Sequence, residues 1–189
     1  MKPMVERLRT ANAVLLCAAV LVLSACAGMQ ATSASPTSPA SSTAPVQHGS
    51  AGEPSASLRL AGALQKPRTL DLAALKALPA SRETQDGRSY TGVDLWALLN
   101  ADGGLAIPSA PRNAALAYYV VATGSDGYQA VFSLSEIDPA MGERKVLVAY
   151  EIDGTPLGRS GMARLVVTGD KKRSRAVANL AAVEVRSAR

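Results

Sequence analysis

The chain has 189 residues and a formal net charge of +5, with two cysteines and one histidine. Cys17 and Cys26 both lie near the start of the chain, and His48 lies in a stretch rich in Ala, Ser, Thr and Pro. The chain beyond residue 56 therefore cannot form a disulfide, a zinc site of His and Cys ligands, or a Ser-His-Asp triad. The mild positive charge does not call for a nucleic-acid partner.

Residues 1–25 have the three parts of a secretory signal. A basic start is followed by an almost wholly apolar stretch from residue 11 to residue 23. This stretch is too short to cross a bilayer, which needs about 20 apolar residues. It ends in Leu23-Ser24-Ala25-Cys26, and small residues before a cysteine are typical of bacterial lipoprotein signals. We therefore predict a signal peptide over 1–25, cleaved before Cys26.

Cys26 is the predicted lipid attachment site, because its thiol takes the diacylglyceryl group. Two or more acyl chains, palmitate among them, hold a protein stably at a lipid bilayer. Ala27 and Gly28 follow the cysteine, with no aspartate at the next position. This favours a periplasmic location, anchored in the inner leaflet of the outer membrane. An ordinary signal peptide with a chance cysteine and an uncleaved anchor are the alternatives.

Residues 26–56 are mostly Ala, Ser, Thr, Pro and Gly, with few apolar side chains. Such a segment cannot bury enough surface to offset its ordering entropy, and its prolines keep it extended. We predict a flexible tether there. One domain is predicted over residues 57–189, because roughly 130 residues suffice for one core and not for two.

Within this domain, apolar patterns predict strands at 58–60, 114–123, 128–132, 146–152, 164–167 and 180–185. Helices are predicted at 69–78, with Thr69 as N-cap, at 94–99 and at 134–137. Residues 124–127 and Asp153-Gly154 have the composition of tight turns, and the first turn makes a hairpin of its flanking strands. This order predicts an α+β fold with a mixed, mainly antiparallel sheet and a few short helices.

Five segments, taken in order, resemble motifs of molybdopterin-binding oxidoreductase domains of the sulfite-oxidase type. They are YTGVDLWALL from Tyr90, DGY from Asp126, LVAYEIDGTPL from Leu147, GMARLVVTG from Gly161 and LAAVEV from Leu180. Each motif is common by itself, so the ordered set carries the resemblance, which covers most of the domain. The resemblance implies the sulfite-oxidase-type fold in a short, stand-alone member that lacks the immunoglobulin-like domain of full enzymes.

The chain departs from this family where catalytic members hold molybdenum. The resemblance implies a metal bound by the pterin dithiolene and one cysteine thiolate, a soft ligand for a soft centre. Residues 82–128, where that cysteine is expected, contain none. Thr168 replaces the family's proline, and residues 170–175 replace its Gly-Lys-rich phosphate loop.

These departures favour a non-catalytic module that binds a small anionic ligand or an envelope protein. One alternative is a molybdopterin-dependent oxidoreductase, or its subunit, that holds the cofactor through Arg164 and the basic loop. A structural envelope lipoprotein without a small ligand is a further alternative. No catalytic residue and no metal ligand is predicted.

The densest basic run is Lys171, Lys172, Arg173 and Arg175. The functional interpretation of this run is an anion site, because arginine binds phosphate with two parallel donors and lysine adds a point charge. A solvated loop that protects a sheet edge is the alternative.

Arg164 and Tyr128 complete the candidate cofactor-binding residues. Arg164 lies inside an apolar strand, where a charge needs a partner. That partner is either a ligand, as the family's equivalent arginine implies, or a carboxylate of Asp126, Glu151 or Asp153. Tyr128 follows the predicted hairpin turn, which either shapes a pocket mouth or has no role beyond the turn.

Overall fold

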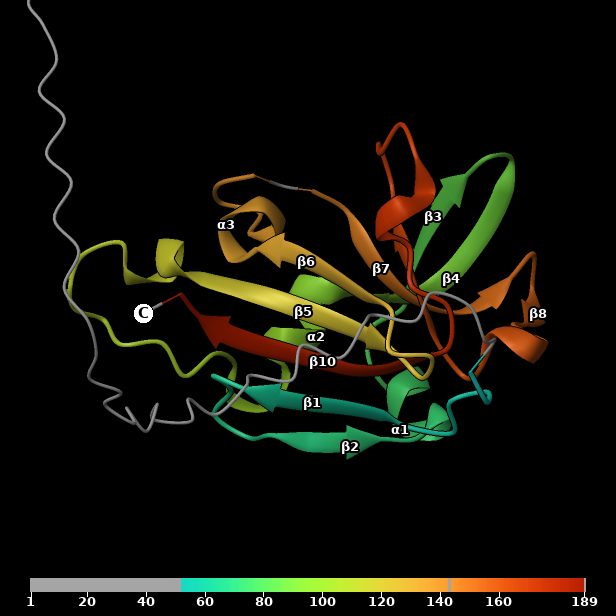
Figure 1. The fold of residues 1–189 in the computed structure, drawn as a ribbon, viewed down its shortest axis with the longest axis horizontal. Helices are drawn as coiled ribbons and strands as arrows, with labels where there is room; N and C mark the ends of the chain where they lie inside the picture. Colours follow the sequence, from blue (N-terminus) through green and yellow to red (C-terminus); the bar gives the residue numbers. More distant parts are fainter. Residues whose placement is uncertain (1–51, 143, 189) are drawn as a thin grey trace, which may run out of the picture. The chain divides into compact units, whose positions relative to one another are not determined.

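The computed structural model describes residues 52–142 and 144–188. The predicted signal peptide, Cys26 and most of the predicted tether lie outside these residues. The described chain forms two β-sheets joined by short helices and loops (Figure 1). No helix in this part of the chain is both long and apolar enough to cross a membrane.

The first sheet contains the start and the end of the domain. Its strands are β1 (Leu58–Gly62), β2 (Arg68–Leu70), β5 (Tyr118–Gly124), β6 (Gln129–Ser133) and β10 (Leu180–Ser187). They lie in the order β2-β1-β10-β5-β6. β1 and β10 are parallel, whereas the other neighbours are antiparallel, so the sheet is mixed.

The second sheet is antiparallel and is organised around one central strand. Its strands are β3 (Ser81–Gln85), β4 (Arg88–Asp94), β7 (Val146–Ile152), β8 (Thr155–Pro156) and β9 (Arg164–Val167). β7 pairs with β4 along one edge, and β8 and β9 share its other edge. β3 pairs only with β4, so the β3–β4 hairpin extends from the sheet.

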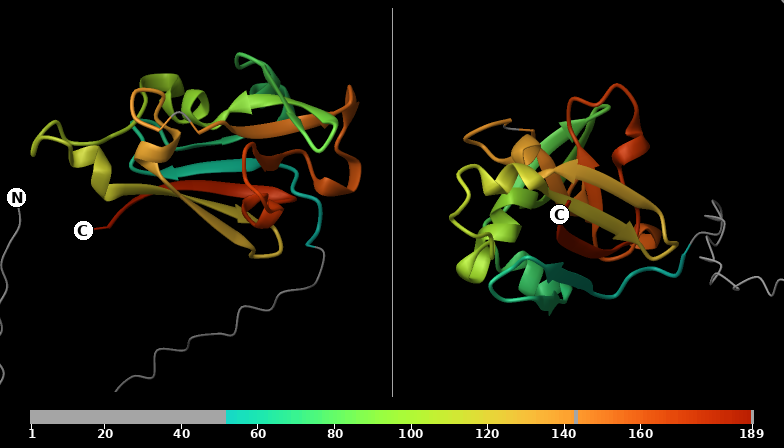
Figure 2. Two further views of the ribbon diagram at one scale, coloured as in Figure 1. Left: turned by 90° about the horizontal axis from the view of Figure 1, so that it is seen from above. Right: turned by 60° about the vertical axis from the view of Figure 1, so that its left-hand side comes forward.

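The two sheets form two layers, as the left view of Figure 2 shows, and one apolar core lies between them. The first sheet contributes Leu60, Phe132 and Val183 to this core, and the second contributes Val148 and Leu165. All five side chains are buried. Burial of this apolar surface is the main force that holds the layers together.

Three short α-helices connect the strands. They are α1 (Leu72–Lys76), α2 (Leu95–Asn100) and α3 (Leu134–Ile137). The carboxylates of Asp71 and Asp94 cap α1 and α2 by accepting hydrogen bonds from Ala74 N and Ala97 N. The described residues also form four 3₁₀ turns: η1 (Ala101–Gly103), η2 (Ala114–Ala117), η3 (Gly158–Ser160) and η4 (Arg173–Arg175).

Residues 52–55 precede the first strand and run along the domain. Ser125 Oγ donates to Glu53 O at 2.6 Å, and Met162 N donates to Ser55 O at 3.0 Å. Asn179 Nδ2 donates to Gly52 O at 3.4 Å. The last residues of the predicted tether therefore make hydrogen bonds to the domain.

The structure confirms the predicted α+β class and the mixed, mainly antiparallel pairing. The strands predicted at 146–152 and 164–167 have the predicted bounds. Two local predictions were wrong. Thr69 lies in β2 and the N-cap is Asp71, while the strand predicted from residue 114 begins at Tyr118, after η2. β2, β3, β4 and β8 were not predicted as strands; the sequence of β3, SRETQ, has no apolar alternation.

Candidate functional site

A pocket of about 370 Å³ lies between the β3–β4 hairpin and the loop that follows β9. Residues 84–86 line it from the hairpin, and residues 168–173 line it from the loop. Three cations of the predicted basic run, Lys171, Lys172 and Arg173, belong to this lining. The pocket is therefore walled by polar and charged residues from two segments that lie far apart in the sequence.

The hairpin wall of the pocket ends in a two-residue turn. Asp86 and Gly87 have φ values of 51° and 74°, and they join the paired residues Gln85 and Arg88. Two positive φ values in a two-residue hairpin loop are typical of a type I′ turn. Gln85 Nε2 donates to Val167 O at 2.9 Å. The hairpin tip is thereby held against the end of β9.

Asp86 also reaches across the pocket. Its carboxylate forms an ion pair with the guanidinium of Arg173. Both side chains are more than half exposed, at 53% and 59%. Exposed ion pairs are weak, because water competes for both partners. The contact therefore joins the two walls of the pocket only weakly.

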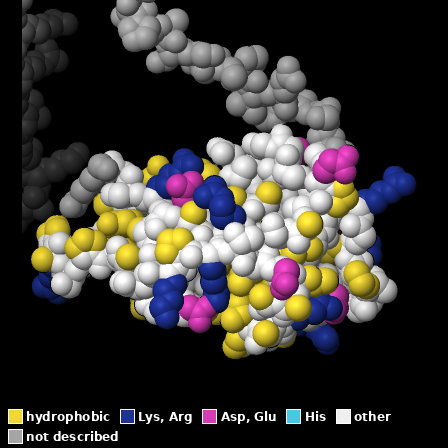
Figure 3. Space-filling model, turned by 90° about the horizontal axis from the view of Figure 1, so that it is seen from below, with side chains coloured by type: hydrophobic (Ala, Val, Ile, Leu, Met, Phe, Trp, Pro, Cys, Tyr) yellow, Lys and Arg dark blue, Asp and Glu magenta, His cyan; other side chains and the backbone are white. Residues whose placement is uncertain are grey.

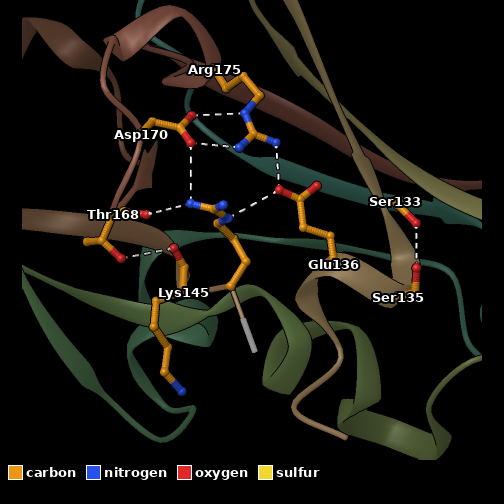
Figure 4. Close-up of polar contacts among 8 residues, drawn as sticks. Ser133, Ser135, Glu136, Lys145, Thr168, Asp170 and Arg175 are labelled. Carbon is orange, nitrogen blue, oxygen red and sulfur yellow. Dashed lines mark hydrogen bonds and ion pairs between the residues drawn. The ribbon is translucent and has the colours of Figure 1, made fainter. Parts of the chain in front are cut away.

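The loop wall is fixed by a network of half-buried ion pairs (Figure 4). The carboxylate of Asp170 accepts two hydrogen bonds from Arg175, at 2.9 and 2.7 Å. Arg175 also donates to Glu136 of α3 at 2.9 Å, and Arg144 joins Glu136 at 3.2 Å and Asp170 at 3.5 Å. This network ties the loop after β9 to α3 and to the start of the segment before β7.

The network shifts the pKa values of Asp170 and Arg175. Hydrogen bonds from Arg175 hold the pKa of the Asp170 carboxyl below its usual range, against the opposing effect of burial. The same hydrogen bonds, which Asp170 accepts, raise the pKa of Arg175. The guanidinium of Arg175 also lies 5.0 Å from the ring centroid of Phe132, which is a cation–π distance. The guanidinium of Arg175 is therefore occupied by contacts within the protein.

Lys171 and Lys172 differ from the arginines beside them. Arg144, Arg173 and Arg175 are all paired with carboxylates. Both lysines are exposed, and neither forms an ion pair within residues 52–142 and 144–188. On the face shown in Figure 3, some basic side chains lie beside acidic ones and others stand alone. The pocket wall therefore carries positive charge that the described chain does not balance.

Tyr128 links two loops and does not line the pocket. Its hydroxyl donates to the carbonyl of Ser174 in η4, and its backbone N–H donates to the Asp126 carboxylate at 2.9 Å. The first contact joins the β5–β6 hairpin to the end of the basic run. Tyr128 therefore supports the loop that carries the predicted anion site, from outside the pocket.

Arg164 lies away from the basic run, at the other end of β9. Its guanidinium is 5.6 Å from the ring centroid of Tyr90, on the outer side of the second sheet. The three carboxylates expected as partners bind elsewhere: Asp126 accepts from Tyr128 N, Glu151 pairs with Lys76, and Asp153 pairs with Arg88. Arg164 Nε is buried without a hydrogen-bond partner among the described residues. The structure does not bring Arg164 and the basic run to one ligand.

Sequence reasoning missed the acidic half of this site. Asp86 and Gln85 form the hairpin wall, and Glu136, Asp170 and Arg144 fix the loop wall. The Asp86-Gly87 pair is a tight-turn signal that was available in the sequence, like Asp153-Gly154. No group of three or more His, Cys, Asp or Glu side chains in the described ranges is arranged to hold a metal ion.

No family model and no curated protein matches the sequence. Among solved structures, the fold is similar to that of the sulfane dehydrogenase SoxCD from Paracoccus pantotrophus, with a TM-score of 0.54 and 17% identity. The match covers 70% of this chain and 38% of that chain. The fold is of the sulfite-oxidase type. At this identity the similarity shows the fold alone, and the chain spans well under half of its neighbour's length.

Proposed function

We propose that this chain is a periplasmic lipoprotein whose domain is a non-catalytic module that binds a small anionic ligand. The binding site is the pocket between the β3–β4 hairpin and the loop after β9. The unbalanced charge of Lys171 and Lys172 on its wall carries the proposal. Neighbouring ammonium groups repel each other, and an anion held between them relieves that repulsion. An envelope protein with an acidic surface is the macromolecular alternative for the same site.

The molybdenum cofactor that the fold implies does not fit the residues present. No cysteine occurs after Cys26, so the domain offers no thiolate to the metal. If the cofactor were bound through Arg164 and the basic loop, both would have to contact it at once. Arg164, however, stacks on Tyr90 at the far end of β9. Arg175 is held by two carboxylates. These contacts support a binding role in place of the alternative, a molybdopterin-dependent oxidoreductase.

The lipid anchor is proposed from the sequence. Residues 1–25 have the features of a secretory signal that ends before Cys26, and acyl groups on that cysteine would insert into the bilayer. The absence of aspartate after Cys26 supports an outer-membrane location. The tether would then let the domain reach ligands in the periplasm at a distance from the membrane.

Elemental analysis and pterin fluorescence test the non-catalytic role. The full chain is purified from the envelope of a host that makes the molybdenum cofactor. We expect neither stoichiometric molybdenum nor pterin, together with measurable binding of inorganic phosphate by calorimetry. Stoichiometric molybdenum would contradict the proposal.

Cell fractionation tests the anchor. Cys26→Ser removes the acceptor thiol, so we expect the variant in the soluble fraction and without acyl mass by mass spectrometry. Cys17→Ser is the control, because Cys17 lies inside the predicted signal and is lost on cleavage. Membrane association of Cys26→Ser at the level of the Cys17→Ser variant would reject the lipoprotein assignment.

A further inference from the structure

The tip of the β3–β4 hairpin places a carboxylate where an anionic ligand would bind. Asp86 forms an ion pair with Arg173, one of the three cations that line the pocket. A guanidinium binds carboxylate and phosphate through the same planar set of donors. Asp86 therefore occupies the donors that a ligand's oxyanion would use.

We propose that Asp86 is a built-in competitor for the ligand of this pocket, and that the ligand is a phosphate monoester. Its dianionic group displaces Asp86 from Arg173 and is held by Arg173, Lys171 and Lys172 together. This inference rests on the proposed function and names the ligand class of the same site.

The two walls of the pocket differ in how firmly they are held. The Asp86–Arg173 pair is more than half exposed on both sides, whereas the side chain of Asp170 in the loop wall is only 14% exposed. Apart from the Asp86 pair, one side-chain hydrogen bond, from Gln85 to Val167 O, ties the hairpin tip to β9 among the described contacts. Displacing Asp86 therefore breaks a weak contact, and the fixed wall keeps the cations in position.

The charge on the pocket favours a dianion over a monoanion. Once Asp86 is displaced, Arg173 joins Lys171 and Lys172 as a free cation, and the displaced carboxylate moves into solvent. A phosphate monoester carries a charge of about −1.5 to −2 at neutral pH on one compact group. A single carboxylate would leave more of this positive charge unbalanced. A pocket of about 370 Å³ also has the size typical of small-molecule sites, so an organic group fits beside the phosphate.

The ligand class is tested by calorimetry on the purified full chain at neutral pH and constant ionic strength. The probe is glycerol 3-phosphate, and glycerate is the control because it has a similar carbon skeleton and one negative charge. We expect glycerate to bind at least about tenfold more weakly. We also expect the double variant Lys171→Gln/Lys172→Gln to lose at least about tenfold in affinity for glycerol 3-phosphate. Equal or tighter binding of glycerate overturns the phosphate assignment and leaves the proposed function standing, whereas binding of neither probe overturns both.

The competitor role is tested with two matched turn variants. Asp86 and Asp153 are both the first residue of an Asp-Gly turn, at φ values of 51° and 49°, and each pairs with an arginine. Asn is well accommodated in such turns, so both Asp→Asn variants are expected to fold. They change the net charge equally, but only Asp86 lies at the pocket. We expect Asp86→Asn to tighten glycerol 3-phosphate binding about 3–10-fold and Asp153→Asn to change it less than twofold. Equal effects of the two variants would overturn the competitor role alone.

A phosphate monoester can be a soluble metabolite or a lipid headgroup. Sedimentation with phosphatidylcholine vesicles that contain phosphatidic acid separates the two sources, with the Cys26→Ser variant used so that acyl chains do not contribute. Binding to glycerol 3-phosphate without vesicle binding supports a soluble ligand. Vesicle binding that requires phosphatidic acid and is lost in the double lysine variant supports a headgroup.

Discussion

Gly161 combines a backbone conformation and a close approach that both require glycine. Its φ is +77°, and an added Cβ would lie 2.6 Å from Ser55 Oγ and 2.9 Å from Asn179 Oδ1. Gly161→Ala should lower the free energy of unfolding by about 2–4 kcal/mol, because φ strain and steric clash add. Gly154→Ala is the control, with the same φ and nothing within 4 Å of the new Cβ, and should cost about 1 kcal/mol. Urea unfolding measures both, and equal losses would contradict the close approach.

Asp170 makes part of the stability depend on pH. Its pKa is lowered by hydrogen bonds from Arg175, so its carboxylate stabilises the fold above the unfolded pKa of about 3.9 and less so as pH falls through the folded pKa. Asp170→Asn should lose about 1–3 kcal/mol of unfolding free energy at pH 7. The difference from the unmodified chain should narrow below about pH 3.9 as Asp170 protonates. Urea unfolding at pH 7 and pH 3 measures it, and a difference independent of pH would show that the ion pair is not its source.

At the scale of single elements, the sequence offers two candidates for the N-cap of α1, Thr69 and Asp71. Thr69 lies in β2, and Asp71 Oδ1 accepts from Ala74 N at 2.7 Å. Asp71→Ala should therefore lower the free energy of unfolding by about 1 kcal/mol, the usual loss of an N-cap. Thr69→Ala should change it by less than about 0.5 kcal/mol, since this exposed threonine caps no helix. Urea unfolding measures both variants. A larger loss of unfolding free energy from Thr69→Ala than from Asp71→Ala would show that Thr69 is the N-cap, as predicted from the sequence.

The strands with long apolar runs could be predicted from the sequence, whereas β2, β3 and β4, which have no such run, were not. The strand at 146–152 is a run of buried side chains, and its Asp153-Gly154 turn carries its own conformational signal. β3 owes its place to pairing with β4, so its polar sequence gives no local indication of a strand. Local pattern also could not reveal that Ala114–Ala117 turns before β5 begins.

The candidate site follows the same division. The basic run was visible because its charges are adjacent in sequence. Its carboxylate partners were not, because Asp86 and Glu136 come from segments far from residues 170–175. Arg164 was singled out as a charge in an apolar strand, yet it stacks on Tyr90 of β4, a strand on the other side of β7. Partners contributed by tertiary pairing are the part that a single sequence does not contain.

At the scale of the whole molecule, both sheets depend on one core. Phe132 of the first sheet is fully buried in the same cluster that contains Val148 and Leu165 of the second. It also lies beneath Arg175, which holds the loop wall of the pocket. Loss of this ring should therefore weaken both layers and the pocket wall at once, rather than one sheet alone.

Phe132→Ala tests this shared dependence. It should lower the free energy of unfolding by about 3–5 kcal/mol, whereas Val131→Ala, at a side chain 52% exposed on the same strand, should cost less than about 0.5 kcal/mol. Trp96 in α2 is the single tryptophan, and its side chain packs against the core. Because one core joins the layers, its fluorescence and far-ultraviolet circular dichroism should report one coincident transition in both variants. Separate transitions for the two probes would contradict the dependence of both layers on one core.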